Sequence, residues 1–360
     1  MKDPNHNLRY LPRLYMVKGA YQSMRAAQEF MNERKVAEID GWVVMGTSKR
    51  GWTTWMIGSS TCKNCPKIKG IIPMVPIEPT FFEGVHQMWR SFGAFSWAFK
   101  DYTDKDIIMP GFDTDSWKIA EDILDPLSYT EEMTKMPKLV IVASGDEFMQ
   151  FEWTNLWWDK LPGEKHLLIL PNTKHSMFSN TPMLANAIAW FFIRIRDGDT
   201  TSHDFTSSFD EKNGKISVEI AEDSLRPLEV SIRYAETLST ERRDVRWVSA
   251  AEEDGTCKFP RYKIKAPIDL CFQPIFWLKE GAEQISERSF EMSVPEPFDK
   301  DHWQGVFAQV TFPAYTPSGH PILDKFIDPN HVVLTSPGWV TPNTFPFEDC
   351  HLESCTNDMV

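Results

Sequence analysis

Two kinds of hydrophobic pattern divide the chain near residue 200. Before that point, short continuous apolar runs alternate with segments of helical period, which is the pattern of a parallel sheet buried on both faces. The strand-like runs end near Ser48, Val75, Ala143 and Leu170. Four strands that alternate with helices predict an α/β domain over residues 1–197.

The predicted helices differ in how they connect these strands. An amphipathic helix precedes the first strand, and further helices are expected over 81–90, 92–99, 115–124, 152–160 and 181–196. The insertion between the second and third strands is too long for a simple crossover helix. We therefore expect a helical lid at about 77–136 over a site, with an ordinary pair of crossover helices as the alternative.

Beyond residue 197 the pattern changes to short strands with alternating faces. Ile216, Val218 and Ile220 alternate with polar residues, and further strand candidates recur up to 332–335. Short strands with turn residues between them predict a β-sandwich of immunoglobulin or fibronectin type over residues 203–360. Glycine and small polar residues at 197–202 mark the linker.

Composition narrows the classes of partner. The chain has 360 residues, 42% hydrophobic and 25% charged, which is typical of a globular protein. A net charge of -13 without a basic run argues against a nucleic-acid partner. No apolar stretch has the length of a membrane span. We expect no cofactor, and a small-molecule or peptide substrate or a protein receptor as partner.

The six cysteines bear on the compartment. Cys62 with Cys65, and Cys350 with Cys355, are spaced so that each pair could form a disulfide, which would imply an oxidising compartment. The start of the chain, by contrast, lacks the pattern of a signal peptide, so localisation stays open. Half of a zinc site at Cys62 and Cys65 is the alternative, but no second pair has ligand spacing, and we expect no metal.

The clearest chemical motif is the stretch from Gly46 to Gly51. A strand ends in a glycine-flanked Ser48 and passes directly into a helix, which is the form of a nucleophile elbow, the tight turn that exposes a serine hydroxyl above a parallel sheet. Arg50 stands where the usual Gly-x-Ser-x-Gly spacing has its second glycine, and Gly51 follows one residue later. Alone, the motif could equally be a strand-to-loop turn that contains a serine.

Two further residues follow later strands in the order that a catalytic triad needs. Ser48 would be the nucleophile, His175 its general base, and Asp146 the group that orients the imidazole. The backbone amide of Lys49 would be an oxyanion donor. Each has another interpretation, because Asp146 could cap a helix, Glu147 could be the acid, and His175 could be an ordinary loop residue.

Several long motifs resemble one family. These are the segments Gly46–Trp55, Gly145–Phe148, Trp157–Lys165, Pro171–His175 and Thr344–Cys350. They are similar to the PhoPQ-activated pathogenicity-related proteins, a family that also includes the secreted autocrine proliferation repressor of social amoebae. The resemblance implies an α/β-hydrolase-like domain followed by a β-rich domain, often exported, and it makes Arg50 part of the family pattern.

The resemblance also predicts a missing segment. Family members carry the first strands of the hydrolase sheet before the helix that begins this chain. Without them, we expect Gly41–Gly46 to form an apolar, unpaired edge. One oxyanion donor would also be lost, at a cost on the order of 10² to 10³ in rate. The expectation is a truncated chain whose hydrolase activity is impaired.

Two functions from different classes follow. The first is a serine hydrolase that cleaves an ester or amide, with His86 and the aromatic lid shaping the substrate pocket, although His86 could simply be a packing residue. The second is a secreted signalling or binding protein that keeps a hydrolase fold without using it and recognises its partner through the β-sandwich.

Overall fold

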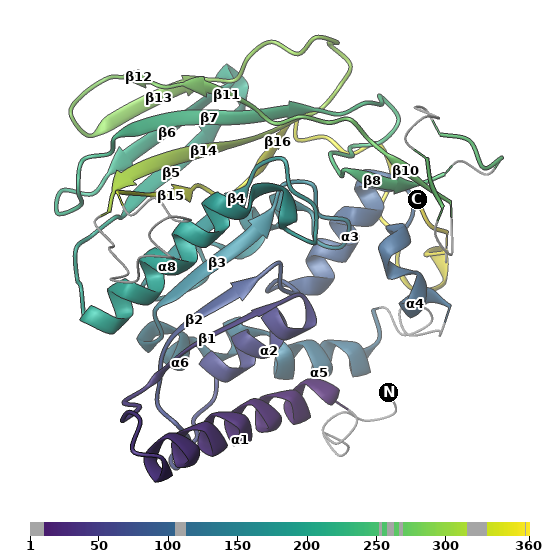
Figure 1. Ribbon diagram of the computed structural model, residues 1–360. Helices are drawn as coiled ribbons and strands as arrows, with labels where there is room; N and C mark the ends of the chain where they lie inside the picture. Colours follow the sequence, from purple (N-terminus) through teal and green to yellow (C-terminus); the bar gives the residue numbers. More distant parts are fainter. Residues whose placement is uncertain are drawn as a thin grey trace.

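The computed structural model describes residues 11–104, 113–251, 254–257, 263–265, 269–314, 330–356 and 358–360. A parallel sheet with helices on both faces lies beneath two stacked antiparallel sheets, as Figure 1 shows. The expected fold class, an α/β-hydrolase-like sheet followed by a β-sandwich, is confirmed.

The parallel sheet contains four strands in the order β1-β2-β3-β4. Their bounds are β1 (Trp42–Thr47), β2 (Ile68–Met74), β3 (Lys138–Ala143) and β4 (Lys165–Leu170). Alternate residues of β3 face opposite ways, because Leu139 and Ile141 join the core beneath the sandwich whereas Val140 and Val142 join the core around Trp55. Burial of both faces explains why this strand has a continuous apolar sequence.

The helices cover both faces of this sheet. Helix α2 (Lys49–Gly58) contributes Trp55 to one core, and α8 (Thr181–Asp197) contributes Phe191 to the other. The remaining helices are α1 (Pro12–Glu33), α3 (Phe81–Phe92), α4 (Lys100–Thr103), α5 (Asp115–Leu124), α6 (Thr130–Lys135) and α7 (Thr154–Trp157), with short 3₁₀ turns between them.

Of the predicted helices, one is absent and one is shorter than expected. Residues 92–99 are not a helix, because Gly93 at φ 69° ends α3 and Phe95 pairs with Met359 of the C-terminal segment. Only a 3₁₀ turn, Trp97–Phe99, remains. The predicted helix 152–160 is reduced to a 3₁₀ turn at Phe151–Trp153 followed by the single turn of α7.

The C-terminal part forms two main antiparallel sheets and one small sheet. One main sheet has the order β11-β7-β14-β15 with β16 beside β14, the other has the order β12-β13-β6-β5, and the small sheet has the order β8-β10-β9. The bounds are β5 (Phe205–Asp210), β6 (Lys215–Ile220), β7 (Glu229–Glu236), β8 (Val248–Ala250), β9 (Lys263–Lys265), β10 (Asp269–Phe272), β11 (Leu278–Gly281), β12 (Glu283–Gln284), β13 (Ser289–Ser293), β14 (Gln304–Pro313), β15 (His331–Thr335) and β16 (Trp339–Thr341).

Strand β14 is buried on both faces and joins the two parts of the chain. Val306 and Val310 pack into the core shared by the two main sheets, whereas Phe307 packs with Phe151 and Trp277. The last residues of the chain also return to the first part, where the amide of Phe347 donates to the carbonyl of Arg90 on α3. The sandwich and the parallel sheet therefore share a continuous apolar interior.

The described cysteines are all paired. The disulfides are Cys62–Cys65, Cys257–Cys271 and Cys350–Cys355. The two pairs expected from spacing are confirmed, and the bond between Cys62 and Cys65 rules out thiolate ligands for zinc there. Among the described helices, none is long and apolar enough to cross a membrane.

Candidate active site

Ser48 stands on a tight turn between β1 and α2. Its backbone has φ 54° and ψ -122°, a conformation that a non-glycine residue adopts only when its surroundings impose it. The Ser48 amide donates to the carbonyl of Met74 at the end of β2, at 2.9 Å. This geometry resembles that of a nucleophile elbow, the strand-to-helix turn that carries the serine in such sites.

Two glycines allow the strand and helix to approach at this turn. A Cβ on Gly46 would lie 2.6 Å from the Arg50 carbonyl oxygen, and a Cβ on Gly51 would lie 2.8 Å from the Met74 carbonyl oxygen. Both neighbours are backbone atoms, so neither position has room for a side chain. Arg50, which stands where the usual motif has its second glycine, is exposed to solvent. The close contact with the end of β2 is made instead by Gly51, one residue later.

The Lys49 amide is the first N–H of α2, and such amides have no carbonyl partner within their own helix. It lies at the positive end of the helix dipole, beside Ser48, where a developing oxyanion is favoured. The Lys49 side chain points elsewhere, with its ammonium 5.6 Å from the ring centre of Tyr102.

Asp146 and His175 meet above the ends of β3 and β4. The Nδ1 atom of His175 lies 2.8 Å from Oδ2 and 3.0 Å from Oδ1 of Asp146. Asp146 is 2% exposed, and its Oδ1 also accepts hydrogen bonds from the amides of Phe148 and Met149. The carboxylate therefore both caps the following turn and holds the imidazole, so the two interpretations from sequence describe the same group.

Glu147 holds the backbone of the histidine loop. Its Oε2 accepts the His175 amide at 2.9 Å, whereas the imidazole is bound by Asp146. Burial, together with the charge of Asp146, raises the pKa of Glu147. Burial lowers the pKa of His175, but the charge and hydrogen bond of Asp146 outweigh it and leave that pKa above its ordinary value.

A series of contacts through aromatic rings runs between the serine turn and the histidine loop. Among the described residues, no hydrogen bond joins the Ser48 hydroxyl to the His175 ring. Instead, contacts run from Lys49 to Tyr102, and then through Phe99 and Phe148 to His175, with ring-centre distances of 6.0, 5.7 and 4.6 Å between successive rings.

His86 does not meet the other expected site residues. Its two ring nitrogens lie 2.9 Å from carboxylate oxygens of Asp113 and Asp349. His351 lies beside it, with the ring centres 5.0 Å apart. Sequence reasoning missed this polar cluster, because its members are up to 265 positions apart in the chain and share no local motif.

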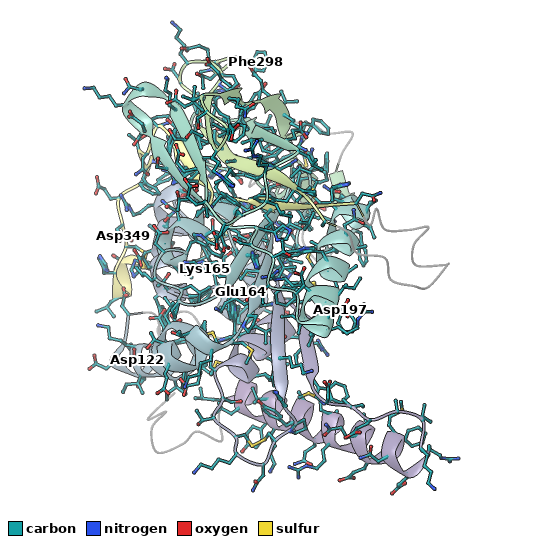
Figure 2. All side chains as sticks on the ribbon, turned by 90° about the vertical axis from the view of Figure 1, so that its left-hand side faces the viewer. Asp122, Glu164, Lys165, Asp197, Phe298 and Asp349 are labelled. Atoms are coloured by element: carbon teal, nitrogen blue, oxygen red, sulfur yellow. A yellow bond between two sulfur atoms is a disulfide. The ribbon has the colours of Figure 1, made fainter. Side chains whose placement is uncertain are left out.

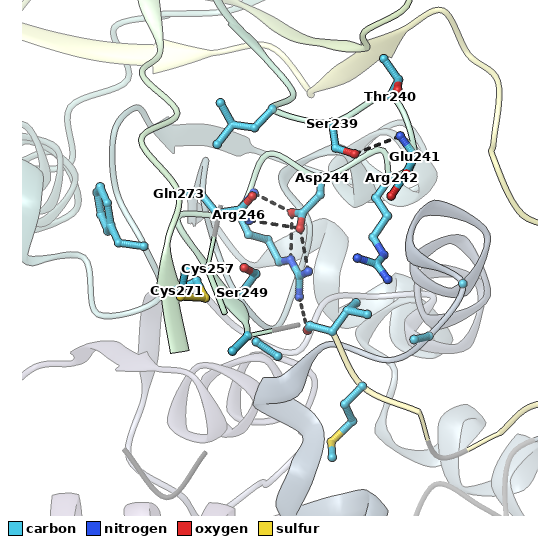
Figure 3. A pocket seen from close by; sticks show the side chains of 18 of the residues that line it. Ser239, Thr240, Glu241, Arg242, Asp244, Arg246, Ser249, Cys257, Cys271 and Gln273 are labelled. Carbon is cyan, nitrogen blue, oxygen red and sulfur yellow. Dashed lines mark hydrogen bonds and ion pairs between the residues drawn. A yellow bond between two sulfur atoms is a disulfide. The ribbon is translucent and has the colours of Figure 1, made fainter. Parts of the chain in front are cut away.

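A cavity of about 970 Å³ lies elsewhere, between the small β8-β10-β9 sheet and the C-terminal segment. Its lining contains none of the three triad candidates. Arg246 is fully buried there and is paired with Asp244 through both Nε and a terminal nitrogen, as Figure 3 shows. It also donates to the backbone oxygen of Val360. Because these charges satisfy one another, the geometry gives this cavity no preferred ligand.

Comparison with known proteins gives one curated relative and several solved structures. The autocrine proliferation repressor protein A of Dictyostelium discoideum is 29% identical over 346 residues, which are 95% of this chain and 64% of that protein. The chain thus spans just under two thirds of the length of that relative.

The solved structures are more distant. Acetyl xylan esterase 1 from Thermoanaerobacterium sp. JW/SL YS485 is 15% identical, with a TM-score of 0.31 over 41% of this chain and 44% of that one. Est1E from Butyrivibrio proteoclasticus is 14% identical, with a TM-score of 0.31 over 47% of this chain and 67% of that one. These likenesses assign neither substrate nor activity.

The family is assigned by a sequence model. The model of the PhoPQ-activated pathogenicity-related protein family matches residues 1–246, which include the elbow, the Asp146 turn and the His175 loop. The chain therefore belongs to the PhoPQ-activated pathogenicity-related protein family.

Proposed function

We propose that this protein is a serine hydrolase that cleaves an ester or amide by a Ser48, His175 and Asp146 triad. The observation that carries the proposal is the buried Asp146 carboxylate held against Nδ1 of His175, at the same edge of the sheet as the strained Ser48 turn. A parallel sheet brings the carboxyl ends of all four strands to one edge, so residues after β1, β3 and β4 share that edge.

The proposed chemistry divides among the three residues. His175 would take the proton from Ser48 as the hydroxyl oxygen attacks the substrate carbonyl, and would return it to the leaving group. Asp146 would keep the proton of neutral His175 on Nδ1 and stabilise the imidazolium. The Lys49 amide would donate to the oxyanion, aided by the N-terminus of α2.

The insertion between β2 and β3 would act as the lid. Tyr102 of this insertion contacts Lys49 beside the elbow. Phe99 contacts Phe148, whose ring packs against His175 of the histidine loop. A lid that touches both loops could bring the serine and the histidine into hydrogen-bond contact when substrate binds, because such contacts often tighten only in the substrate complex.

A labelling experiment tests the proposal. A fluorophosphonate probe should label the wild-type chain and hydrolysis of p-nitrophenyl acetate should be measurable, and both should be lost in Ser48→Ala. Ser128→Ala is the matched control, because Ser128 is an exposed serine of the same domain, and it should behave as wild type. Labelling and turnover that persist in Ser48→Ala would refute Ser48 as the nucleophile.

A non-catalytic role in secreted signalling is the second candidate. It is favoured by the likeness to a protein named as an autocrine proliferation repressor and by three disulfides, which are typical of an oxidising compartment. It predicts that Ser48→Ala and His175→Ala leave biological activity intact and that the β-sandwich is required. An assay of growth repression with these variants separates the two candidates.

A further inference from the structure

The polar cluster around His86 combines three parts of the chain outside the proposed triad. His86 comes from α3, Asp113 from the turn before α5, and Asp349 and His351 from the C-terminal segment. Figure 2 shows Asp349 at one side of the molecule, on that segment. Two imidazoles and two carboxylates converge where three separate segments meet.

The spacing within the cluster matches a metal site. One ligand atom from each of His86, Asp113 and His351 can be chosen so that all lie within 4.8 Å of one another. His86 Nε2 is 2.9 Å from Asp113 Oδ1, and His351 Nδ1 is 3.3 Å from Asp113 Oδ2. Ligand atoms bonded to tetrahedral zinc at about 2.0–2.1 Å lie about 3.3 Å apart. The His351 separation equals that spacing and the His86 separation is shorter, and the two histidines contact different oxygens of Asp113, either of which could be the ligand.

Asp349 occupies the place of an outer partner. Its Oδ1 lies 2.9 Å from Nδ1 of His86, on the side of the ring opposite Asp113. A histidine that binds a metal through one nitrogen usually donates its other N–H to such a carboxylate, which fixes the tautomer and the ring orientation. The amide of Cys350 donates to the same Asp349 oxygen and holds it in place.

The loop that carries His351 is fixed before any ligand binds. The Cys350–Cys355 disulfide closes it, the His351 amide donates to Ser354 Oγ at 2.7 Å, and the Ser354 amide donates back to the His351 carbonyl. The His351 side chain is 69% exposed, so a coordination position facing solvent would remain for water. A pre-ordered loop lowers the entropy cost of binding.

We propose that His86, Asp113 and His351 form a binding site for a divalent transition-metal ion, zinc above all, with Asp349 as the outer partner of His86. Imidazole nitrogen with one carboxylate is a ligand set that suits zinc rather than calcium or magnesium. The ion would tie α3 and the turn before α5 to the C-terminal segment. The site contains no triad residue, so zinc binding can be measured without any assay of hydrolysis.

Zinc titration of the untagged, chelator-treated chain tests the site. The wild type should bind one zinc ion per chain with micromolar affinity or better, measured by competition with a chromophoric chelator. His351→Ala should weaken binding about 100-fold, and Asp349→Asn about 10-fold, as is usual for loss of an outer partner. The melting temperature of each variant without zinc shows whether the substitution itself perturbs the fold.

His302 provides the matched control. It also lies beside two carboxylates, those of Glu236 and Asp299, at 3.5 and 3.6 Å, but those contacts include no second imidazole. His302→Ala should therefore bind zinc as the wild type does. The proposal is overturned if the wild type binds no zinc at millimolar concentration, or if His351→Ala retains wild-type affinity. Either result would leave the cluster as an ion-pair network.

Discussion

The two edges of the parallel sheet differ in how they are protected. At the β4 edge, strand β15 of the sandwich packs alongside, and the Ile169 amide donates to Thr335 Oγ1 at 2.9 Å. At the β1 edge, no strand among the described residues pairs with the outer side of β1, and Met45 is 55% exposed. The proposed base lies after the covered edge strand, and the proposed nucleophile lies after the exposed one.

This difference separates two ways of holding a reactive group. Asp146 and His175 are positioned by side-chain hydrogen bonds inside a buried region. Ser48 is positioned by backbone strain and by the close approach of Gly46 and Gly51 to backbone atoms. Substitutions that remove side-chain hydrogen bonds should therefore impair the function of His175. Substitutions that add a side chain where backbone atoms are in close contact should impair the function of Ser48.

The largest expected effect is on catalysis at the covered side. Asp146→Asn should lower kcat about 10⁴-fold, because an amide that donates to Nδ1 would favour the wrong imidazole tautomer. Asp122→Asn, a change at an exposed aspartate shown in Figure 2, is the control and should leave kcat unchanged. Steady-state hydrolysis of p-nitrophenyl acetate measures both, and equal rates in the two variants would contradict the role of Asp146.

The same contact predicts a pH dependence. Burial lowers the pKa of His175, but Asp146 raises it more, and only the neutral imidazole can accept the serine proton. The rate should therefore rise with pH, about tenfold per pH unit on the acid side, up to an inflection above the ordinary histidine value. In Asp146→Asn the inflection of the residual activity should move to lower pH. If the inflection of Asp146→Asn lies at the same pH as that of the wild type, Asp146 does not set the pKa of the catalytic base.

At the exposed side, backbone fit should matter most. Gly51→Ala places a Cβ 2.8 Å from the Met74 oxygen and 3.0 Å from Pro76 Cα, and neither backbone atom can move cheaply. We expect a loss of about 1–3 kcal/mol in the free energy of unfolding and reduced labelling of Ser48. Gly281→Ala, where nothing lies within 4 Å, should change that free energy by less than about 0.5 kcal/mol. Urea unfolding compares them.

The sequence predicted what local pattern determines. The apolar run predicted to end near Ala143 forms β3, which ends at that residue, because burial on both faces needs an unbroken apolar run. The order of Ser48, Asp146 and His175 also placed Asp146 beside His175, since each residue follows its own strand. Both features can be predicted from the alternation of strands and helices along the chain alone.

What the sequence did not predict depends on distant contacts. Residues 92–99 have helical composition, yet Phe95 pairs with Met359, 264 positions later, and tertiary pairing overrides local preference. The His86 cluster needs Asp113, Asp349 and His351 to meet in space. Gly51 was visible as a displaced glycine, but its contact with β2 becomes evident only once the strands are placed.

A medium effect is expected where the sandwich covers β4. Thr335→Val keeps the side-chain shape but removes the acceptor of the buried Ile169 amide, and an unpaired buried amide costs about 1–3 kcal/mol. The free energy of unfolding should fall by about that amount. Thr335→Ser, which retains the hydroxyl, should restore most of it. If Thr335→Val is as stable as wild type, the contact does not secure this edge.

The smallest effect is expected at the opposite edge, at Met45. Because this side chain is 55% exposed and lies on the unpaired side of the sheet, Met45→Lys removes little buried apolar area and should change the free energy of unfolding by less than about 0.5 kcal/mol. Lysine on an edge strand also discourages pairing with another chain, so the variant should be no more prone to aggregate. Urea unfolding and light scattering of Met45→Lys beside Thr335→Val compare the two edges directly. A loss at Met45 as large as that at Thr335 would mean that β1 is covered in solution, and that the nucleophile side is protected as well as the base side.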